Sequence, residues 1–160
     1  MAIEVGDQIP DVTLRVLDEG GMPAPVQSGE MLGSGKVVLF AVPGAFTPGC
    51  SNVHLPGYIE GASELAGKGV AKIVCVSVND AWTMNAWAQA QGAEGIEMAA
   101  DGNGDFAEAM GLVMDGSGFG LGSRSRRYAA VIEDGTVTAL EVEPAGAVDV
   151  SSCASILGKL

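Results

Sequence analysis

Short runs of apolar, often β-branched residues recur along this chain, and the first two do not alternate with polar residues. Runs of this kind are typical of strands that are covered on both faces, as in the middle of an α/β sheet. The strand-like runs lie at residues 37–42, 70–78, 96–100, 128–133 and 136–142. Because Asp134-Gly135 separates the last two runs, we predict that they form a β-hairpin.

Helical segments are predicted between and after these runs. They cover residues 50–65, 81–91 and 105–110, with a last helix running from Ser151 or Ser152 to Leu160. Asn79-Asp80 can cap the second of these helices and Gly92 can end it, whereas the first should be interrupted or bent near Pro56-Gly57. Strands and helices therefore alternate after a β-rich start, which predicts a single mixed α/β domain over residues 1–160.

The composition narrows the class of protein. Apolar residues make up 48% of the chain and charged residues 18%, a balance that excludes intrinsic disorder. A net charge of -12 disfavours binding to nucleic acids or anionic membranes. No apolar run approaches the roughly 20 residues that cross a bilayer, and residues 1–7 do not resemble a targeting signal. We therefore expect a cytoplasmic protein whose three cysteines are free thiols.

The loop at residues 43–50 carries the strongest chemical signal. It follows a buried strand, so parallel crossovers would place it at the carboxyl end of that strand, where α/β sheets form their ligand crevice. Pro48 suits the first helical position, which puts Cys50 in the first turn, where free N–H groups and the helix dipole stabilise a thiolate. Thr47 can direct a hydroxyl at the sulfur, and Pro43 can shield it from water. The local chemistry also leaves open a buried, inert Cys50.

A metal site is the weaker interpretation of Cys50 and His54, although they lie one helical turn apart. The chain has a single histidine and no second Cys/His pair, whereas a structural zinc needs a full set of such ligands. We therefore expect neither a metal nor a cofactor. We expect His54 to be a core histidine that supports the site and hydrogen-bonds the backbone.

The segment Pro43-Gly-Ala-Phe-Thr-Pro-Gly-Cys-Ser-Asn-Val-His-Leu-Pro-Gly-Tyr58 closely resembles the active-site segment of the type II (atypical) peroxiredoxins. The resemblance continues at residues 76–80, 100–105, 109–112 and 120–128, so it covers essentially the whole chain. It implies a thioredoxin-like α/β fold with three layers and a central mixed β-sheet, in agreement with the predicted order of elements.

The resemblance also implies roles for individual residues. Cys50 would be the peroxidatic cysteine, Thr47 its hydroxyl partner and Pro43 its shield. Arg127 would pair its guanidinium with the thiolate and the peroxide. The residues expected to contact the substrate are Gly49, Cys50, Thr47 and Arg127. The local pattern alone does not single out Arg127, because two further arginines stand within three residues of it.

By the same resemblance, the protein would reduce hydrogen peroxide and alkyl hydroperoxides through a Cys50 sulfenic acid. Cys75 matches the second cysteine of the plant members but lies in an apolar, strand-like run. Cys153 lies later than the resolving cysteine of some animal members. We therefore expect glutathione with glutaredoxin, or thioredoxin, to reduce Cys50 directly, with Cys75 and Cys153 as the alternative resolving thiols.

Other classes of protein stay open on the residues alone. A thiol-based redox sensor or holdase would oxidise at Cys50 with little turnover, and a thioredoxin-like binding module would lack catalysis. A disulfide oxidoreductase is disfavoured, because Thr47 and Val53 occupy the positions that a C-x-x-C partner of Cys50 would need.

The glycine-rich stretch at residues 116–122 is expected to be a flexible loop beside the active site. Phe119 and Leu121 within it would line an apolar wall or a dimer contact. Because members of the resembling family commonly form homodimers, we predict a homodimer here.

Overall fold

A seven-stranded mixed sheet organises the structure, a computed structural model that describes residues 1–160. Its strands are β1 (Thr13–Leu17), β2 (Pro23–Gln27), β3 (Lys36–Ala41), β4 (Lys72–Ser77), β5 (Glu97–Ala100), β8 (Tyr128–Glu133) and β9 (Thr136–Val142). They lie in the order β2-β1-β5-β4-β3-β8-β9, with β3, β4 and β5 parallel and the other pairs antiparallel. β3 and β4 are therefore interior strands, as their continuous apolar runs predicted.

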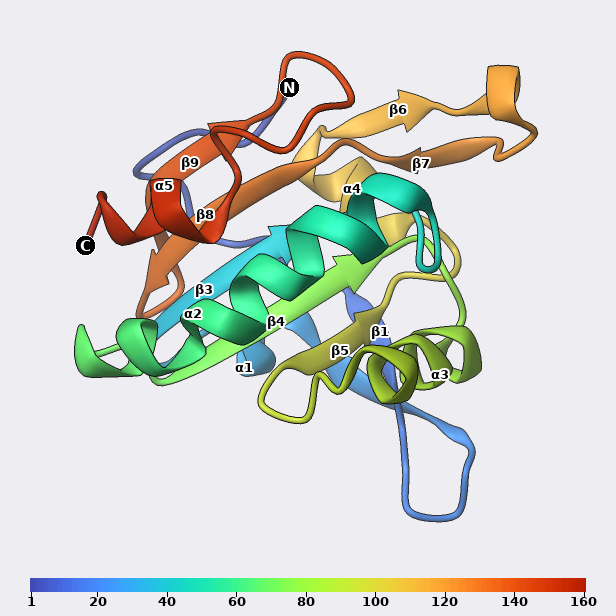
Figure 1. Cartoon of the computed structure of the whole chain (residues 1–160), viewed down its shortest axis with the longest axis horizontal. Coiled ribbons are helices and arrows are strands. Elements are labelled where there is room, and N and C mark those ends of the chain that lie inside the picture. Colours follow the sequence, from blue (N-terminus) through green and yellow to red (C-terminus); the bar gives the residue numbers. More distant parts are fainter.

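Helices cover both faces of the sheet and give three layers (Figure 1). The helices are α1 (Ser28–Met31), α2 (Leu55–Gly67), α3 (Ala81–Gln91), α4 (Asp105–Met110) and α5 (Cys153–Leu157). Side chains of α2, α3 and α5 share one apolar cluster with one face of the sheet, and those of α1 and α4 share a second cluster with the other face. This is the predicted thioredoxin-like arrangement. None of the helices combines the length and the apolar character that crossing a membrane requires.

β3 shows why its sequence lacks the alternation of a surface strand. Val38 and Phe40 point into the cluster with α2 and α3, while Val37 and Leu39 point into the cluster with α1 and α4. Neighbouring side chains of a strand leave on opposite faces, so a strand covered on both sides is apolar throughout. The loop that follows β3 therefore starts from the middle of the core.

Several predicted local features are present. Asp80 caps α3 by accepting a hydrogen bond from the Thr83 N–H at 2.7 Å, and Gly92 follows the helix in the left-handed conformation at φ 69°. The turn of the β8–β9 hairpin is Asp134-Gly135, where both residues have positive φ, at 49° and 84°. A two-residue turn with this backbone matches the twist of the flanking strands.

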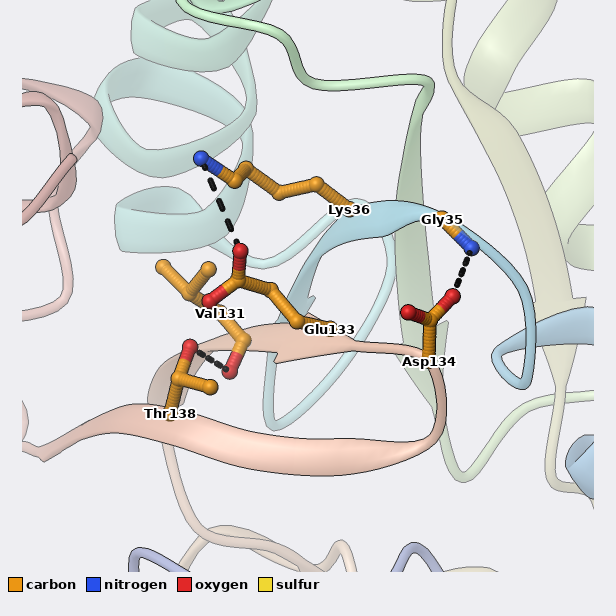
Figure 2. Close-up of polar contacts among 6 residues, drawn as sticks. All are labelled: Gly35, Lys36, Val131, Glu133, Asp134 and Thr138. Atoms are coloured by element: carbon orange, nitrogen blue, oxygen red, sulfur yellow. Dashed lines mark hydrogen bonds and ion pairs between the residues drawn. The ribbon is translucent and has the colours of Figure 1, made fainter.

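The β8–β9 hairpin is fastened to the start of β3 at its turn (Figure 2). The Gly35 N–H donates to the Asp134 carboxylate at 2.9 Å. Further along, the Thr138 hydroxyl donates to the Val131 carbonyl at 3.3 Å, where the register of the two strands shifts. The first contact joins the hairpin to the start of β3, and the second joins β9 to β8; β3 and β8 are the two strands that lead to the candidate site.

Two helices differ from expectation. The irregularity expected at Pro56-Gly57 lies one turn earlier, in a π-helical turn at Cys50–His54, and α2 runs through both of those residues. Pro56 has no N–H to donate to the preceding turn, which leaves that turn free to widen. The last helix starts after its Ser152 cap but ends at Leu157 rather than at Leu160.

The glycine-rich stretch is not an open loop. It forms the tip of a two-stranded ribbon of β6 (Val113–Asp115) and β7 (Ser123–Ser125), with a 3₁₀ turn at Ser117–Phe119 between them. The ribbon projects beyond the main sheet (Figure 1). Phe119 lies in its 3₁₀ turn and is 86% exposed. The sequence did not reveal these strands because each is only three residues long and lacks an apolar pattern.

Gly61 in α2 provides a test of the packing between α2 and α5. A Cβ at this position would overlap the Cys153 sulfur. We expect Gly61→Ala to lower the free energy of unfolding by about 1–3 kcal/mol through overpacking. In a Cys153→Ala background the same change should be neutral or stabilising, since alanine favours a helix by about 1 kcal/mol over glycine. Denaturant unfolding measures both effects, and an equal loss in the two backgrounds would contradict the argument.

Candidate active site

The loop after β3 brings Cys50 to the carboxyl end of the parallel strands. β3 lies between β4 and β8, so the loop leaves the sheet from an interior strand, as the sequence predicted. Within the loop the Thr47 hydroxyl donates to the Gly44 carbonyl at 2.6 Å, and Phe46 holds a left-handed backbone at φ 64°. Positive φ is strained for a bulky side chain, and such strain clusters at functional sites. The helix then begins at Pro48, the predicted position.

Cys50 opens a π-helical turn that ends at His54. The Leu55 N–H donates to the Cys50 carbonyl five residues back, where an α-helix would bond four residues back. The Cys50 side chain is fully buried, at 0% exposure. Backbone N–H groups in the first turn of a helix lack partners inside the helix, and they favour an anion such as a thiolate.

Arg127 is the cation that reaches this sulfur. It directly precedes β8, is 6% exposed, and its Nη2 lies 3.2 Å from Cys50 Sγ. The side chains of Arg124 and Arg126 donate instead to backbone carbonyls. None of the three ion pairs of the structure includes Arg127. A thiolate at Cys50 would therefore be its counter-ion.

His54 holds the other side of the guanidinium. Its Nδ1 accepts a hydrogen bond from Arg127 Nη1 at 2.9 Å, and its Nε2 lies 3.0 Å from the Ser151 carbonyl oxygen. A guanidinium has no lone pair to offer, so the ring proton must sit on Nε2 and be donated to Ser151. Burial, opposed by the hydrogen bond to Ser151, lowers the pKa of His54 from 6.5 to about 4. His54 is therefore a neutral core histidine at pH 7 that bonds the backbone, as expected.

The other residues expected at the site lie close by along the chain. A Cβ on Gly49 would come 3.2 Å from Arg127 Nη2, so glycine lets the guanidinium approach the backbone closely. The Thr47 hydroxyl donates its proton to the Gly44 carbonyl, which leaves its lone pairs free to accept. Its role toward a peroxide stays a prediction, and so does the shielding by Pro43.

Cys75 and Cys153 are buried thiols rather than ready nucleophiles. All three cysteines of the chain are free. Cys75 lies inside β4 at 0% exposure, and burial raises the pKa of its thiol well above the usual value of 9.0. Cys153 opens α5 against Gly61, and burial raises the pKa of its thiol to about 11. Only the thiolate attacks, so neither group is reactive in place at pH 7.

Trp87 is a contact of the site that the sequence did not reveal. Its indole N–H donates to the Ser51 hydroxyl at 2.9 Å, which ties α3 to the turn that holds Cys50. The Trp87 ring is fully buried, whereas Trp82 is 52% exposed and donates to the Gly21 carbonyl. A buried tryptophan usually finds a partner for its N–H, and this rule indicates a polar neighbour without identifying it as Ser51.

A protein family and several known proteins match nearly the whole chain. A family model described as Redoxin matches residues 4–157. Peroxiredoxin-2E-2, chloroplastic, of Oryza sativa subsp. japonica is 48% identical over 163 residues, which cover 99% of this chain and 72% of that protein. Peroxiredoxin-2B of Arabidopsis thaliana is 43% identical over 159 residues, which cover 99% of this chain and 98% of that protein.

A solved structure agrees in fold as well as in sequence. Reduced Prx3 of Vibrio vulnificus in complex with H₂O₂ superposes with a TM-score of 0.93 at 50% identity, covering 98% of this chain and 95% of that chain. The predicted family and the thioredoxin-like fold are thereby confirmed. This chain therefore belongs to the type II peroxiredoxins and is a thiol peroxidase.

Proposed function

We propose that Cys50 is the peroxidatic cysteine and that it reduces hydrogen peroxide and alkyl hydroperoxides through a sulfenic acid. The observation that carries this proposal is the 3.2 Å contact between Arg127 Nη2 and the buried Cys50 Sγ. A guanidinium stays charged in proteins, so at this distance it favours a thiolate over a thiol. The thiolate is the nucleophile that an attack on peroxide requires.

The chemistry would be one displacement. The Cys50 thiolate attacks one peroxide oxygen, so that an S–O bond forms while the O–O bond breaks. The leaving hydroxide or alkoxide takes a proton from water, which releases water or an alcohol and leaves Cys50 as the sulfenic acid. Arg127 and the first-turn N–H groups stabilise the charge that moves from sulfur to the leaving oxygen. Thr47 can accept a hydrogen bond from the peroxide O–H, because its own proton is engaged by Gly44.

An external thiol would reduce the sulfenic acid. Its attack on the Cys50 sulfur forms a mixed disulfide and releases water. A second thiol of the reductant then attacks this mixed disulfide, which regenerates the Cys50 thiol and leaves the two reductant thiols joined as a disulfide. Glutathione with glutaredoxin, or thioredoxin, supplies such thiols. The burial of Cys75 and Cys153 supports this route, because neither thiol ionises readily where it lies.

Turnover should survive the loss of either internal thiol. We expect Cys75→Ala and Cys153→Ala to consume peroxide at the wild-type rate when glutathione and glutaredoxin, or thioredoxin and its reductase, are in excess. Alanine is the better replacement than serine because both sites are buried and a new hydroxyl would need a partner. Coupled NADPH oxidation measures the rate. A folded variant without turnover would identify its missing cysteine as the resolving thiol.

Stopped-flow oxidation of the reduced protein by stoichiometric hydrogen peroxide tests the peroxidase role of Cys50. A Trp82→Phe background leaves Trp87, which contacts the turn of Cys50, as the single tryptophan reporter. We expect oxidation orders of magnitude faster than that of free cysteine, and no fast phase in Cys50→Ser. A rate like that of free cysteine would overturn the assignment. Fast oxidation without turnover under every reductant would instead support a thiol-based sensor or holdase.

We also propose that the enzyme is a homodimer and that it works in the cytoplasm. Exposed apolar side chains support a dimer, with Phe119 86%, Phe46 54% and Val53 53% exposed. Free cysteines suit a reducing compartment. Sedimentation equilibrium tests the dimer, and a monomer at micromolar concentration would exclude it. Imaging of the tagged protein in cells tests the compartment, and an extracytoplasmic signal would exclude the cytoplasm.

A further inference from the structure

Arg127 lacks a carboxylate partner although its charge is buried. Its guanidinium has two side-chain contacts, one to the Cys50 sulfur and one to His54, and its Nε has no partner. A carboxylate in place of His54 would offset the positive charge and weaken its attraction for a thiolate. A neutral imidazole orients the guanidinium and leaves its charge for the sulfur.

The Ser151 carbonyl sets the state of this imidazole. It accepts hydrogen bonds from His54 Nε2 at 3.0 Å and from the Tyr58 hydroxyl at 2.7 Å. With the ring proton held on Nε2, Nδ1 must present a lone pair to Arg127. Ser151, His54 and Tyr58 are each at most 1% exposed, so bulk water does not compete for these bonds.

Glu143 in turn holds Ser151. One carboxylate oxygen, Oε2, accepts from the Ser151 N–H at 2.8 Å, from the Ser151 hydroxyl at 2.6 Å and from the Asp149 N–H at 2.7 Å. Glu143 follows β9 directly and is 4% exposed, and residues 144–150 between it and Ser151 form no helix or strand. The Glu143 carboxylate therefore holds the end of this irregular segment, at Asp149 and Ser151, against the core.

These contacts close into a ring. The Glu143 N–H donates to the Arg127 carbonyl at 2.9 Å. Glu143 is therefore bonded to Arg127 through its backbone and to Ser151 through its side chain. On the basis of the peroxidase role proposed for Cys50, we propose that Glu143 is a positioning residue for the reaction. Its carboxylate anchors Ser151 and thereby, through His54, keeps the Arg127 guanidinium on the Cys50 sulfur.

Glu143→Ala tests this proposal, with Glu141→Ala as the matched control. Glu141 lies on β9 and forms an ion pair with Lys159 at 2.8 Å. Its replacement also removes one negative charge and one contact to the C-terminal segment, but not the contact to Ser151. The first readout is the pH dependence of iodoacetamide alkylation at Cys50, resolved by mass spectrometry. The second is the rate of oxidation by hydrogen peroxide.

The expected result separates positioning from general stability. In Glu143→Ala the midpoint of the alkylation profile should rise by about one pH unit, and oxidation at neutral pH should slow about tenfold. Glu141→Ala should change neither. A purely structural role of Glu143 would lower the melting temperature and leave the midpoint of the folded protein unmoved, and that result would overturn the proposal.

A second pair of variants tests the same ring without touching Glu143. In His54→Asn the amide oxygen can replace Nδ1 and accept from Arg127, but the shorter side chain has no donor where Nε2 was and loses Ser151. In His54→Gln the amide nitrogen can replace Nε2 and donate to Ser151, but no acceptor lies where Nδ1 was. Each variant breaks one link between Ser151 and Arg127, so we expect both to raise the midpoint. A wild-type midpoint in either folded variant would also overturn the proposal.

Failure of the positioning role can be told from failure of the proposed function. A wild-type protein that reacts with peroxide no faster than free cysteine removes the peroxidase role of Cys50 and the positioning role with it. A fast wild-type protein and an equally fast, folded Glu143→Ala variant remove only the positioning role.

Discussion

Replacing Arg127 by alanine is expected to slow the oxidation of Cys50 by hydrogen peroxide about 10²–10³-fold. The guanidinium lies 3.2 Å from a fully buried sulfur, so water screens its charge weakly and the charge acts on both the thiolate and the leaving oxygen. Loss of one such preorganised donor typically has an effect of this size. Stopped-flow fluorescence of Trp87 measures the second-order rate constant directly.

Two further variants separate the charge of Arg127 from its geometry. Arg127→Lys keeps a positive charge but lacks the planar fork that contacts Cys50 and His54 together, so we expect a rate between those of the wild-type protein and the alanine variant. Arg15→Ala removes an exposed arginine from β1 and should leave the rate unchanged. A folded Arg127→Ala protein that reacts at the wild-type rate would remove the observation on which the proposed chemistry depends.

Lowering the pH from 7 toward 4 should remove about 3 kcal/mol from the free energy of unfolding through His54 alone. Chiefly because of burial, the pKa of His54 falls from 6.5 to about 4 in the folded protein. Between these two values the unfolded chain binds a proton at His54 and the folded chain does not, so acid favours the unfolded state. Once the pH is below the folded-state pKa, both states are protonated and the loss is complete.

His54→Asn isolates this effect, because asparagine does not titrate and can still accept a hydrogen bond from Arg127. Denaturant unfolding between pH 7 and pH 5 should show a steeper loss of stability in the wild-type protein than in the variant. Glu143 contributes in a more acidic range, since its hydrogen bonds, against the opposing effect of burial, lower its pKa below 4.5. If the free energy of unfolding fell equally with pH in the two proteins, His54 would not be a neutral, buried group in the folded protein.

Most strands and helices could be predicted because their signals are local. The apolar runs of β3 and β4, the Asp80 cap and Gly92 stop of α3, and the Asp134-Gly135 turn each lie within a few residues of the feature that they determine. Capping and turn geometry depend on neighbouring backbone groups, which a sequence displays directly. The π-helical turn at Cys50–His54 was misplaced because a proline predicts an irregular helix but not the side on which the turn widens.

Cys50 was identifiable for the same reason. Pro48 and the strand before it place the cysteine in a first helical turn, and the resemblance of its segment to a known family implied its role. The resemblance at residues 120–128 also implied Arg127, but the local residue pattern alone could not choose it over Arg124 or Arg126. The contact that decides between them joins residues 77 positions apart, and it exists only because β3 pairs with β8.

The sequence by itself determined the order of the elements and the position of the nucleophile, since both depend on short stretches of chain. Only the tertiary structure decided what surrounds the sulfur. Arg127, His54, Ser151 and Glu143 come from separate segments, and they meet where β8, the π-helical turn and the C-terminal segment pack together. A buried polar group can bond to any partner of suitable chemistry that the fold brings within reach. The identity of that partner is therefore not recorded in any local pattern of a single sequence.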